Sequence, residues 1–233
     1  MSIIRDIHQI DVSPLLFCRE PFSSISHLMG SAVYAGLAYR FIQLGRGDWI
    51  RTISLSVMAI ASVLLLLMSG TYHLFWPGPM RAIMLRIDVV SVFLMIAASM
   101  TPAHAILFTG WSRWGSLVLI WAVAILGIAW RTFYWDTTHG SAAVIVFLLF
   151  GWGSLITGII LWRRFGWRFV QPAFLSGLAY SSGAIVLMLH RPILVPGIIG
   201  PHEIWHVAVL TGIGLQWYFV SQFASGHVKQ SGP

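Results

Sequence analysis

The sequence predicts an all-α integral membrane protein, a bundle of seven transmembrane helices. Of its 233 residues, 58% are hydrophobic and only 9% are charged, whereas a soluble domain carries about 25% charged residues. The mean hydropathy is +0.81. Seven long stretches contain no Asp, Glu, Lys or Arg, and a helix needs roughly 20 mostly apolar residues to cross the hydrocarbon core. The connections between these stretches leave no room for a soluble domain.

Turn-forming residues separate the predicted helices, for example at Gly45–Asp48, Trp76–Pro79 and Pro192–Pro201. Tryptophans lie near several of the predicted ends, as in the aromatic belts at membrane interfaces. The expected spans are about 27–44, 52–75, 86–108, 114–134, 139–162, 170–190 and 203–223.

Small residues recur inside these spans, such as Gly30 in the first and Gly151, Gly153 and Gly158 in the fifth. In membrane proteins such residues let neighbouring helices approach closely, so we expect tight packing there. The expected organisation is a polar N-terminal segment, 1–26, a seven-helix domain, 27–223, and a C-terminal tail, 224–233.

The chain is basic, with 14 Lys and Arg against 7 Asp and Glu and a net charge of +7. In a soluble protein this balance would suggest nucleic acid as a partner. Here the arginines mostly flank hydrophobic segments, where such side chains anchor to lipid head groups. We therefore expect membrane lipid, and no nucleic acid, as the partner. The arginines divide almost evenly between the two sides of the bundle, so they do not fix its orientation.

His202 and His206 begin the seventh predicted helix. Their spacing of four residues puts both imidazoles on one face, where they can hold a single zinc ion. With Glu203 they form the HExxH pattern of zinc proteases, in which the glutamate is the general base. Such a protease needs a third ligand, but no Asp or Glu follows His206, and His227 lies at the far end of the helix.

The third ligand is therefore expected upstream. Glu203, turned about 100° around the helix from His202 and about 60° from His206, is expected to orient a ligand or to pair with an arginine.

Three polar residues of the second and third spans lie at this same end of the bundle. Ser69 and His73 share a face at the end of the second span, and Asp88 begins the third. Ionisable groups at membrane depth are costly and are candidates for function. We predict a zinc site with His73, His202 and His206 as ligands, since three imidazoles leave one position open for water. Asp88 is the candidate proton acceptor and Ser69 a hydrogen-bond donor.

Each of these residues also has a simpler interpretation. A single intramembrane histidine, such as His27, is more often a hydrogen-bond partner between helices than a metal ligand. Asp88 taken alone could be a counter-ion for Arg86 or Arg81, and Ser69 taken alone a packing residue. The histidine pair together with a third histidine at matching depth favours the metal site.

Three separated motifs resemble the hemolysin III and progestin and adipoQ receptor family. Ser69 to His73 looks like the S-x3-H of that family's second helix, and His202 to His206 matches the H-x3-H of its seventh. Asp88, followed by Thr101-Pro102, is similar to its third helix, which begins with Asp and ends in Thr-Pro. The resemblance spans nearly the whole chain.

The segment from Glu20 to His27 resembles the family's first motif, with three departures around the site. Ser23 and Ser26 replace the usual Asn and Thr, and Val89 follows the third-helix Asp in place of a polar residue. These departures affect the expected substrate contacts more than the expected metal ligands.

The resemblance implies zinc held by His73, His202 and His206, with Asp88 and Ser69 around the metal-bound water. It also implies an N-terminus and zinc site on the cytoplasmic side of the cell membrane, and zinc-dependent hydrolysis of a lipid amide, which we extend to an amide or ester as the leading hypothesis. The name of the bacterial branch implies cytolytic activity. Three functions stay open at this point: a lipid hydrolase, a pore-forming or membrane-perturbing protein with structural zinc, and a lipid-sensing protein of membrane homeostasis.

Overall fold

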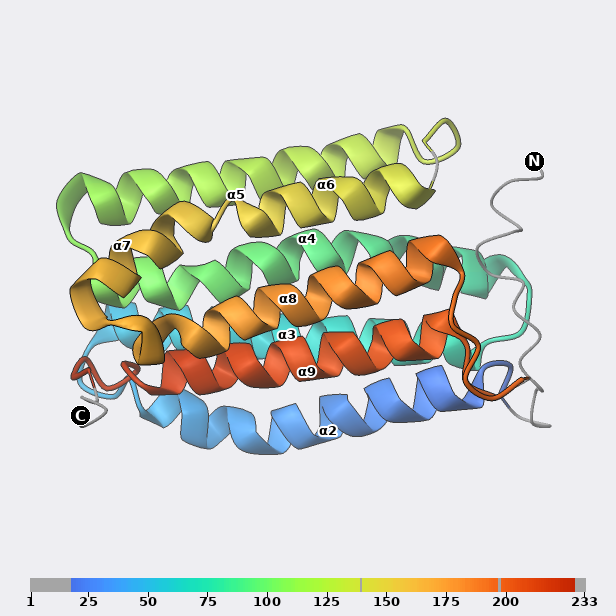
Figure 1. The fold of residues 1–233 in the computed structure, drawn as a ribbon, viewed down its shortest axis with the longest axis horizontal. Coiled ribbons are helices and arrows are strands. Elements are labelled where there is room, and N and C mark those ends of the chain that lie inside the picture. The colour runs from blue at the N-terminus through green and yellow to red at the C-terminus, as the bar shows by residue number, and fades with distance from the viewer. Residues whose placement is uncertain (1–17, 139, 197, 229–233) are drawn as a thin grey trace.

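A computed structural model describes residues 18–138, 140–196 and 198–228 of the chain. Within these residues the regular elements are all helices, which run along one common direction (Figure 1). They are α2 (Pro21–Gln43), α3 (Trp49–Leu74), α4 (Pro79–Leu107), α5 (Gly110–Phe133), α6 (Gly140–Trp152), α7 (Leu155–Phe165), α8 (Trp167–Leu189) and α9 (Pro201–Ser221). The predicted all-α class is confirmed for this part of the chain.

Three helices begin at a proline, earlier than the sequence predicted. Pro21, Pro79 and Pro201 open α2, α4 and α9, in place of expected starts near 27, 86 and 203. Proline suits the first helical position because its fixed φ is helical and its missing N–H would have no partner there. The expected starts relied on apolar runs and so left out these polar first turns. Most of residues 1–26, expected as a separate segment, lie outside the described ranges.

The fifth predicted span consists of two consecutive helices, α6 and α7, with a break in the helix at Gly153 (Figure 1). A Cβ added at Gly151 or Gly158 would meet nothing within 4 Å, so the expected close packing is wrong at these two positions. At Gly30 the expectation is confirmed, because a Cβ there would lie 2.6 Å from Cδ2 of Leu210.

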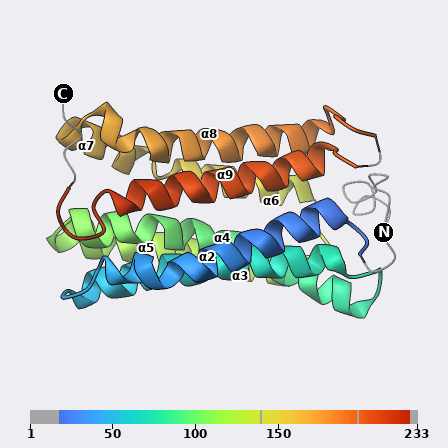
Figure 2. The ribbon, with the colours of Figure 1, turned by 90° about the horizontal axis from the view of Figure 1, so that it is seen from below.

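Six segments of the described chain are long and apolar enough to cross a membrane, namely α3, α4, α5, α6 with α7, α8 and α9. This makes the chain a multi-pass membrane protein. The remaining helix, α2, is more polar in its first turns, which contain Ser23, Ser24, Ser26 and His27. It nevertheless lies alongside α3 and α9 over most of their length (Figure 2).

The outer and inner faces of α2 differ in character. Exposed apolar side chains recur on the outer face at Ile25, Met29, Val33 and Leu37. On the inner face, the Ser24 hydroxyl donates to the carbonyl of Gly70 at 2.9 Å. Serine hydroxyls that bond to a neighbouring helix are a usual means of helix association in membranes.

The helix ends meet in two groups. The first turns of α2, α4 and α9 and the last turn of α3 lie at one end of the bundle, on the right in Figure 1. We call this the histidine end, because His27, His73, His202 and His206 lie in these turns or in the turn next to them. The opposite end, where α8 begins and α9 finishes, is called the far end.

Candidate metal centre

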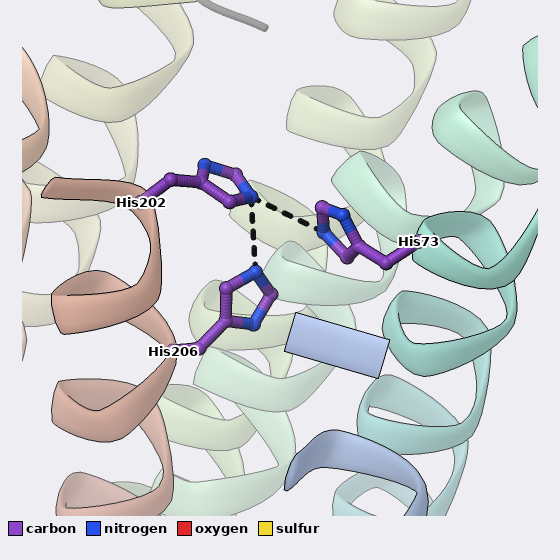
Figure 3. Close-up of side chains that lie close together, drawn as sticks. All are labelled: His73, His202 and His206. Atoms are coloured by element: carbon purple, nitrogen blue, oxygen red, sulfur yellow. Dashed lines mark hydrogen bonds between the residues drawn. The ribbon is translucent and has the colours of Figure 1, made fainter. Parts of the chain in front are cut away.

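The three predicted ligands point toward one another at the histidine end (Figure 3). Nε2 of His202 lies 3.2 Å from Nε2 of His73 and 3.0 Å from Nε2 of His206. Two nitrogens bound to one tetrahedral zinc at about 2.0–2.1 Å are about 3.3 Å apart. One ligand atom from each residue lies within 4.8 Å of the other two, so this group could hold a metal ion.

A buried carboxylate sets the orientation of His73. Nδ1 of His73 bonds to Oε2 of Glu20, the residue just before α2. The other carboxylate oxygen accepts from Nη2 of Arg81 at 2.6 Å. A metal-binding histidine usually donates its second N–H to such a partner, which fixes the tautomer. With the proton assigned to Nδ1, the Nε2 lone pair of His73 faces the other two histidines.

Arg81 is itself held at the end of α3. Its Nη1 donates to the carbonyls of Tyr72 at 3.0 Å and Phe75 at 2.7 Å. Burial acts to raise the pKa of Glu20, but the hydrogen bond and charge of His73, together with the charge of Arg81, lower it to about 2. Glu20 is therefore ionised at neutral pH, as an acceptor for both partners must be.

His206 has a second histidine as its partner. Both ring nitrogens of His27 lie close to Nδ1 of His206, at 2.8 and 3.1 Å, and Nε2 of His27 is 3.3 Å from the main-chain oxygen of His206. A neutral His27 ring accepts from Nδ1–H of His206 through its unprotonated nitrogen, which leaves the Nε2 lone pair of His206 free to bind a metal.

Asp88 and Ser69 line the same cavity as this triad. Ser69 is buried near the end of α3, and Asp88 lies in α4. Arg81 pairs with Glu20 instead, and Asp88 takes part in no ion pair among the described residues. The alternative of a counter-ion for Arg86 or Arg81 is therefore not supported.

The five predicted site residues line one cavity. Its volume is about 680 Å³, and most of its lining is apolar, from helices α3, α4 and α6 to α9. The lining reaches from His202 at the histidine end to Trp162 and Trp167 near the turn between α7 and α8. The cavity can therefore admit a long apolar molecule with its polar part beside the histidines.

The Glu203 side chain stabilises the start of α9. Its Oε2 accepts from the N–H of Gly200 at 2.9 Å, and its Oε1 accepts from the hydroxyl of Ser23 at 3.2 Å. The side chain thus caps the start of its own helix and ties it to α2. The expected pairing with an arginine is wrong, because the partners of Glu203 are the N–H of Gly200 and the hydroxyl of Ser23.

The sequence did not reveal the roles of Glu20 and His27. The two ends of each contact are far apart in the chain, 53 residues for Glu20 with His73 and 179 for His27 with His206. One available signal was the position of both residues on a single short segment at the histidine end.

Together these features define a class: a helical multi-pass membrane protein with a histidine triad and a carboxylate on the wall of an internal cavity. A family model described as haemolysin-III related matches residues 16–217. The chain belongs to this family, in agreement with the resemblance found in its motifs.

Individual relatives agree with this assignment. The chain is 24% identical to Hemolysin-3 of Bacillus cereus over 168 residues, which cover 72% of this chain and 74% of the relative. It is 26% identical to a hemolysin-3 homolog of Bacillus subtilis, covering 72% and 76% of the two chains. An uncharacterized protein of Schizosaccharomyces pombe is 27% identical over 60% of this chain but only 35% of its own length.

Proposed function

We propose that the protein is a zinc-binding membrane hydrolase that cleaves an amide or ester bond of a membrane lipid. The observation that supports this proposal is the convergence of three imidazole nitrogens on the wall of a largely apolar cavity that also contains Asp88.

The donor set fits zinc well. Three neutral imidazoles, with Nε2 of His202 at 3.2 and 3.0 Å from the Nε2 atoms of the other two, are close to the ligand spacing of a tetrahedral site and leave a position open. Each of His73 and His206 has a partner at Nδ1 that directs its Nε2 lone pair inward. Zinc, when bound, supplies a Lewis acid that lowers the pKa of water.

The remaining steps belong to side chains of this protein. The Asp88 carboxylate accepts a proton from the attacking water and returns it to the departing nitrogen or oxygen. In this proposal the Ser69 hydroxyl, which lines the same cavity, donates to this carboxylate. The apolar lining holds the acyl chain and excludes bulk water, so a lipid is a better fit than a soluble peptide.

A second function is suggested by the names of the two Bacillus relatives, Hemolysin-3 and its homolog. A lytic protein would release solutes across a membrane and leave the lipids chemically intact. In that case the histidine triad would have a structural role.

One experiment separates the two functions. Purified protein in liposomes containing lipid amides and esters is incubated, and both dye release and lipid masses are measured. We expect about one zinc per chain in the wild type, and cleaved lipids in the mass spectrum. The double variant His202→Ala/His206→Ala should lose both zinc and turnover.

Asp88→Asn sharpens this test because it keeps the three ligands. It should retain zinc and lose about 10²–10⁴-fold in turnover, the usual contribution of general acid–base catalysis. His104→Ala, on the far side of the same cavity, is the matched control and should keep its zinc. Undiminished turnover in the double variant, or dye release with unchanged lipids, would overturn the hydrolase proposal.

We also propose that α2, the first helix along the chain, crosses the membrane as well and brings the number of spans to seven. The histidine end would then face the cytoplasm across the cell membrane. The 23 residues of α2 reach about 35 Å, enough to cross the hydrocarbon core, and its exposed outer face is apolar. The orientation rests on the family resemblance. Labelling of single cysteines placed in the 45–48 and 76–78 turns, in intact cells, tests both statements.

A further inference from the structure

The connection between α8 and α9 exposes a group of large aliphatic side chains at the histidine end. It follows Leu189, the last residue of α8, and leads to Pro201, the first residue of α9 (Figure 1). Four of its side chains form a group that we call the apolar tip: Ile193, Leu194, Val195 and Ile198, all of them exposed. A contiguous exposed apolar group of this kind marks a surface that contacts another molecule or a membrane.

The main chain of this connection satisfies most of its own hydrogen bonds. The carbonyls of Val195 and Ile199 accept bonds of 2.8–3.1 Å from four N–H groups of the same short turn, those of Leu194, Val195, Ile198 and Ile199. Pro192 and Pro196 have no N–H that needs an acceptor. A polar backbone group without a partner is costly in the hydrocarbon layer. This backbone therefore suits a segment that is partly surrounded by lipid.

The apolar tip continues the outer surface of α8. Ile185, Met188 and Leu189 in the last turns of α8 are exposed, and their spacing of three and four residues puts them on one face of the helix. Because α8 is long and apolar enough to cross a membrane, this exposed face is a surface for lipid. The residues from His190 to His202 include one arginine, Arg191, and no Asp or Glu, so no acidic group interrupts the surface.

The other connections at this end expose a different kind of side chain. The turn between α3 and α4 exposes Trp76, and the connection between α5 and α6 exposes Tyr134, Asp136 and Thr137. Tryptophan and tyrosine are enriched at the level of the lipid head groups, and a charged carboxylate faces water. Among the described connections of the histidine end, only the one between α8 and α9 presents a group of exposed aliphatic side chains.

We propose that the apolar tip is inserted into the leaflet at the histidine end and anchors this end of the bundle at the boundary between head groups and acyl chains. An apolar surface next to a cation, here Arg191, is the usual composition of a segment that lies in this boundary. The partner of the tip is the lipid surface itself. The inference requires only that the chain is a multi-pass membrane protein, and it depends neither on zinc nor on hydrolysis.

Such an anchor would fix the depth of the candidate metal centre. Four residues separate Ile198 from His202, and a chain of this length spans at most about 14 Å. The last residue of the connection, Gly200, donates its N–H to Glu203 at 2.9 Å and so joins the connection to the first turn of α9. The histidine triad is therefore held within a short distance of the level that the tip occupies in the leaflet.

The test measures the surroundings of the tip with a fluorophore. A single cysteine replaces Leu194 in a Cys18→Ser background, is labelled with an NBD group, and the full chain is placed in phosphatidylcholine nanodiscs, which leave both faces open to solutes. Quenching by iodide in water is compared with quenching by phosphatidylcholine that carries a spin label on its acyl chain. Thr137→Cys is the matched control, because Thr137 is exposed on a polar connection at the same end.

The label at position 194 should be quenched by the spin-labelled lipid, and its iodide quenching constant should be several times smaller than that of the label at position 137. Iodide quenching equal to that of the control would show that the tip lies in water and would refute the anchor. Protection from both quenchers would show that protein covers the tip, either a second copy of the chain or residues 1–17, and would refute it equally.

A change in the tip gives an independent result. Ile198→Asp places a carboxylate that is costly to move out of water and should raise iodide quenching at position 194 toward the value of the control. Ile198→Leu keeps the apolar surface and should leave the quenching unchanged. The label at position 137 should respond to neither change, which shows that the bundle is intact. An unchanged label at position 194 in Ile198→Asp would contradict insertion of the tip.

Discussion

The two ends of the bundle are held together by different forces. At the histidine end, hydrogen bonds and charges join segments far apart in the chain, as in Glu20 with His73 and Arg81. At the far end, aromatic rings pack against one another, with Phe169 at 5.9 Å and Phe219 at 5.1 Å from the centroid of Phe223. The histidine end therefore depends on buried charged groups, whereas the far end combines aromatic packing with single hydrogen bonds such as that from Gln222 Nε2 to the carbonyl of Phe169 at 3.2 Å.

Because of this difference, the geometry of the metal site depends on the histidine end, whereas both ends contribute to the stability of the fold. Hydrogen bonds fix both the position and the tautomer of a ring, which a metal site requires. Apolar packing stabilises helix association without fixing any lone pair. We therefore expect changes at the far end to affect stability alone, and changes at the histidine end to affect zinc affinity as well.

The largest effect is expected for Glu20→Ala. It leaves the buried Arg81 charge and the His73 N–H without their acceptor, which costs about 3–5 kcal/mol of stability for a broken buried ion pair. Zinc affinity should also fall about 10–100-fold, since the tautomer of His73 is no longer fixed. Thermal unfolding in detergent and competition with a chromophoric chelator measure the two quantities.

Phe223→Ala is the matched change at the far end. Removing this fully buried ring should also cost about 3–5 kcal/mol, but zinc affinity should stay that of the wild type. Equal losses of zinc affinity in the two variants would show that the ends are not independent.

A smaller effect is expected for His27→Ala, which removes the partner of His206 Nδ1 but no charge. Zinc affinity should fall about tenfold, the lower part of the range for the loss of an orienting partner. His104→Ala is the control, because His104 is a buried histidine bonded to Thr157 at 3.1 Å, away from the triad. If both variants bind zinc equally well, His27 does not orient the site.

The sequence predicted the parts of this molecule that depend on local periodicity. The spacing of His202 and His206 and the order of the helices were enough to bring His73, Ser69 and Asp88 to the same cavity. Helix starts were less well predicted, because polar first turns such as the one after Pro21 carry little hydropathy signal.

The contacts that complete the site were beyond such reasoning. The partners of Glu20 and His27 depend on how α2 lies against α3 and α9, and no periodicity in one helix specifies its neighbour. The same holds for Glu203, whose bonds to Gly200 and Ser23 follow from the position of α9 beside α2. The HExxH pattern alone suggested a catalytic base, whereas the fold gives this glutamate a capping role.

The smallest effect is therefore expected for Glu203→Gln. The amide oxygen of Gln can still accept from Gly200, and its NH2 group can donate to the hydroxyl oxygen of Ser23, so the main loss is the charge near the start of α9, at a cost of about 0.3–1 kcal/mol. Lipid turnover should stay within about twofold of the wild type, a change equivalent to less than 1 kcal/mol. A general base at this position would instead cost about 10²–10⁴-fold in rate. Turnover and thermal unfolding of the same preparation distinguish a cap, which changes stability slightly, from a base, which changes the rate.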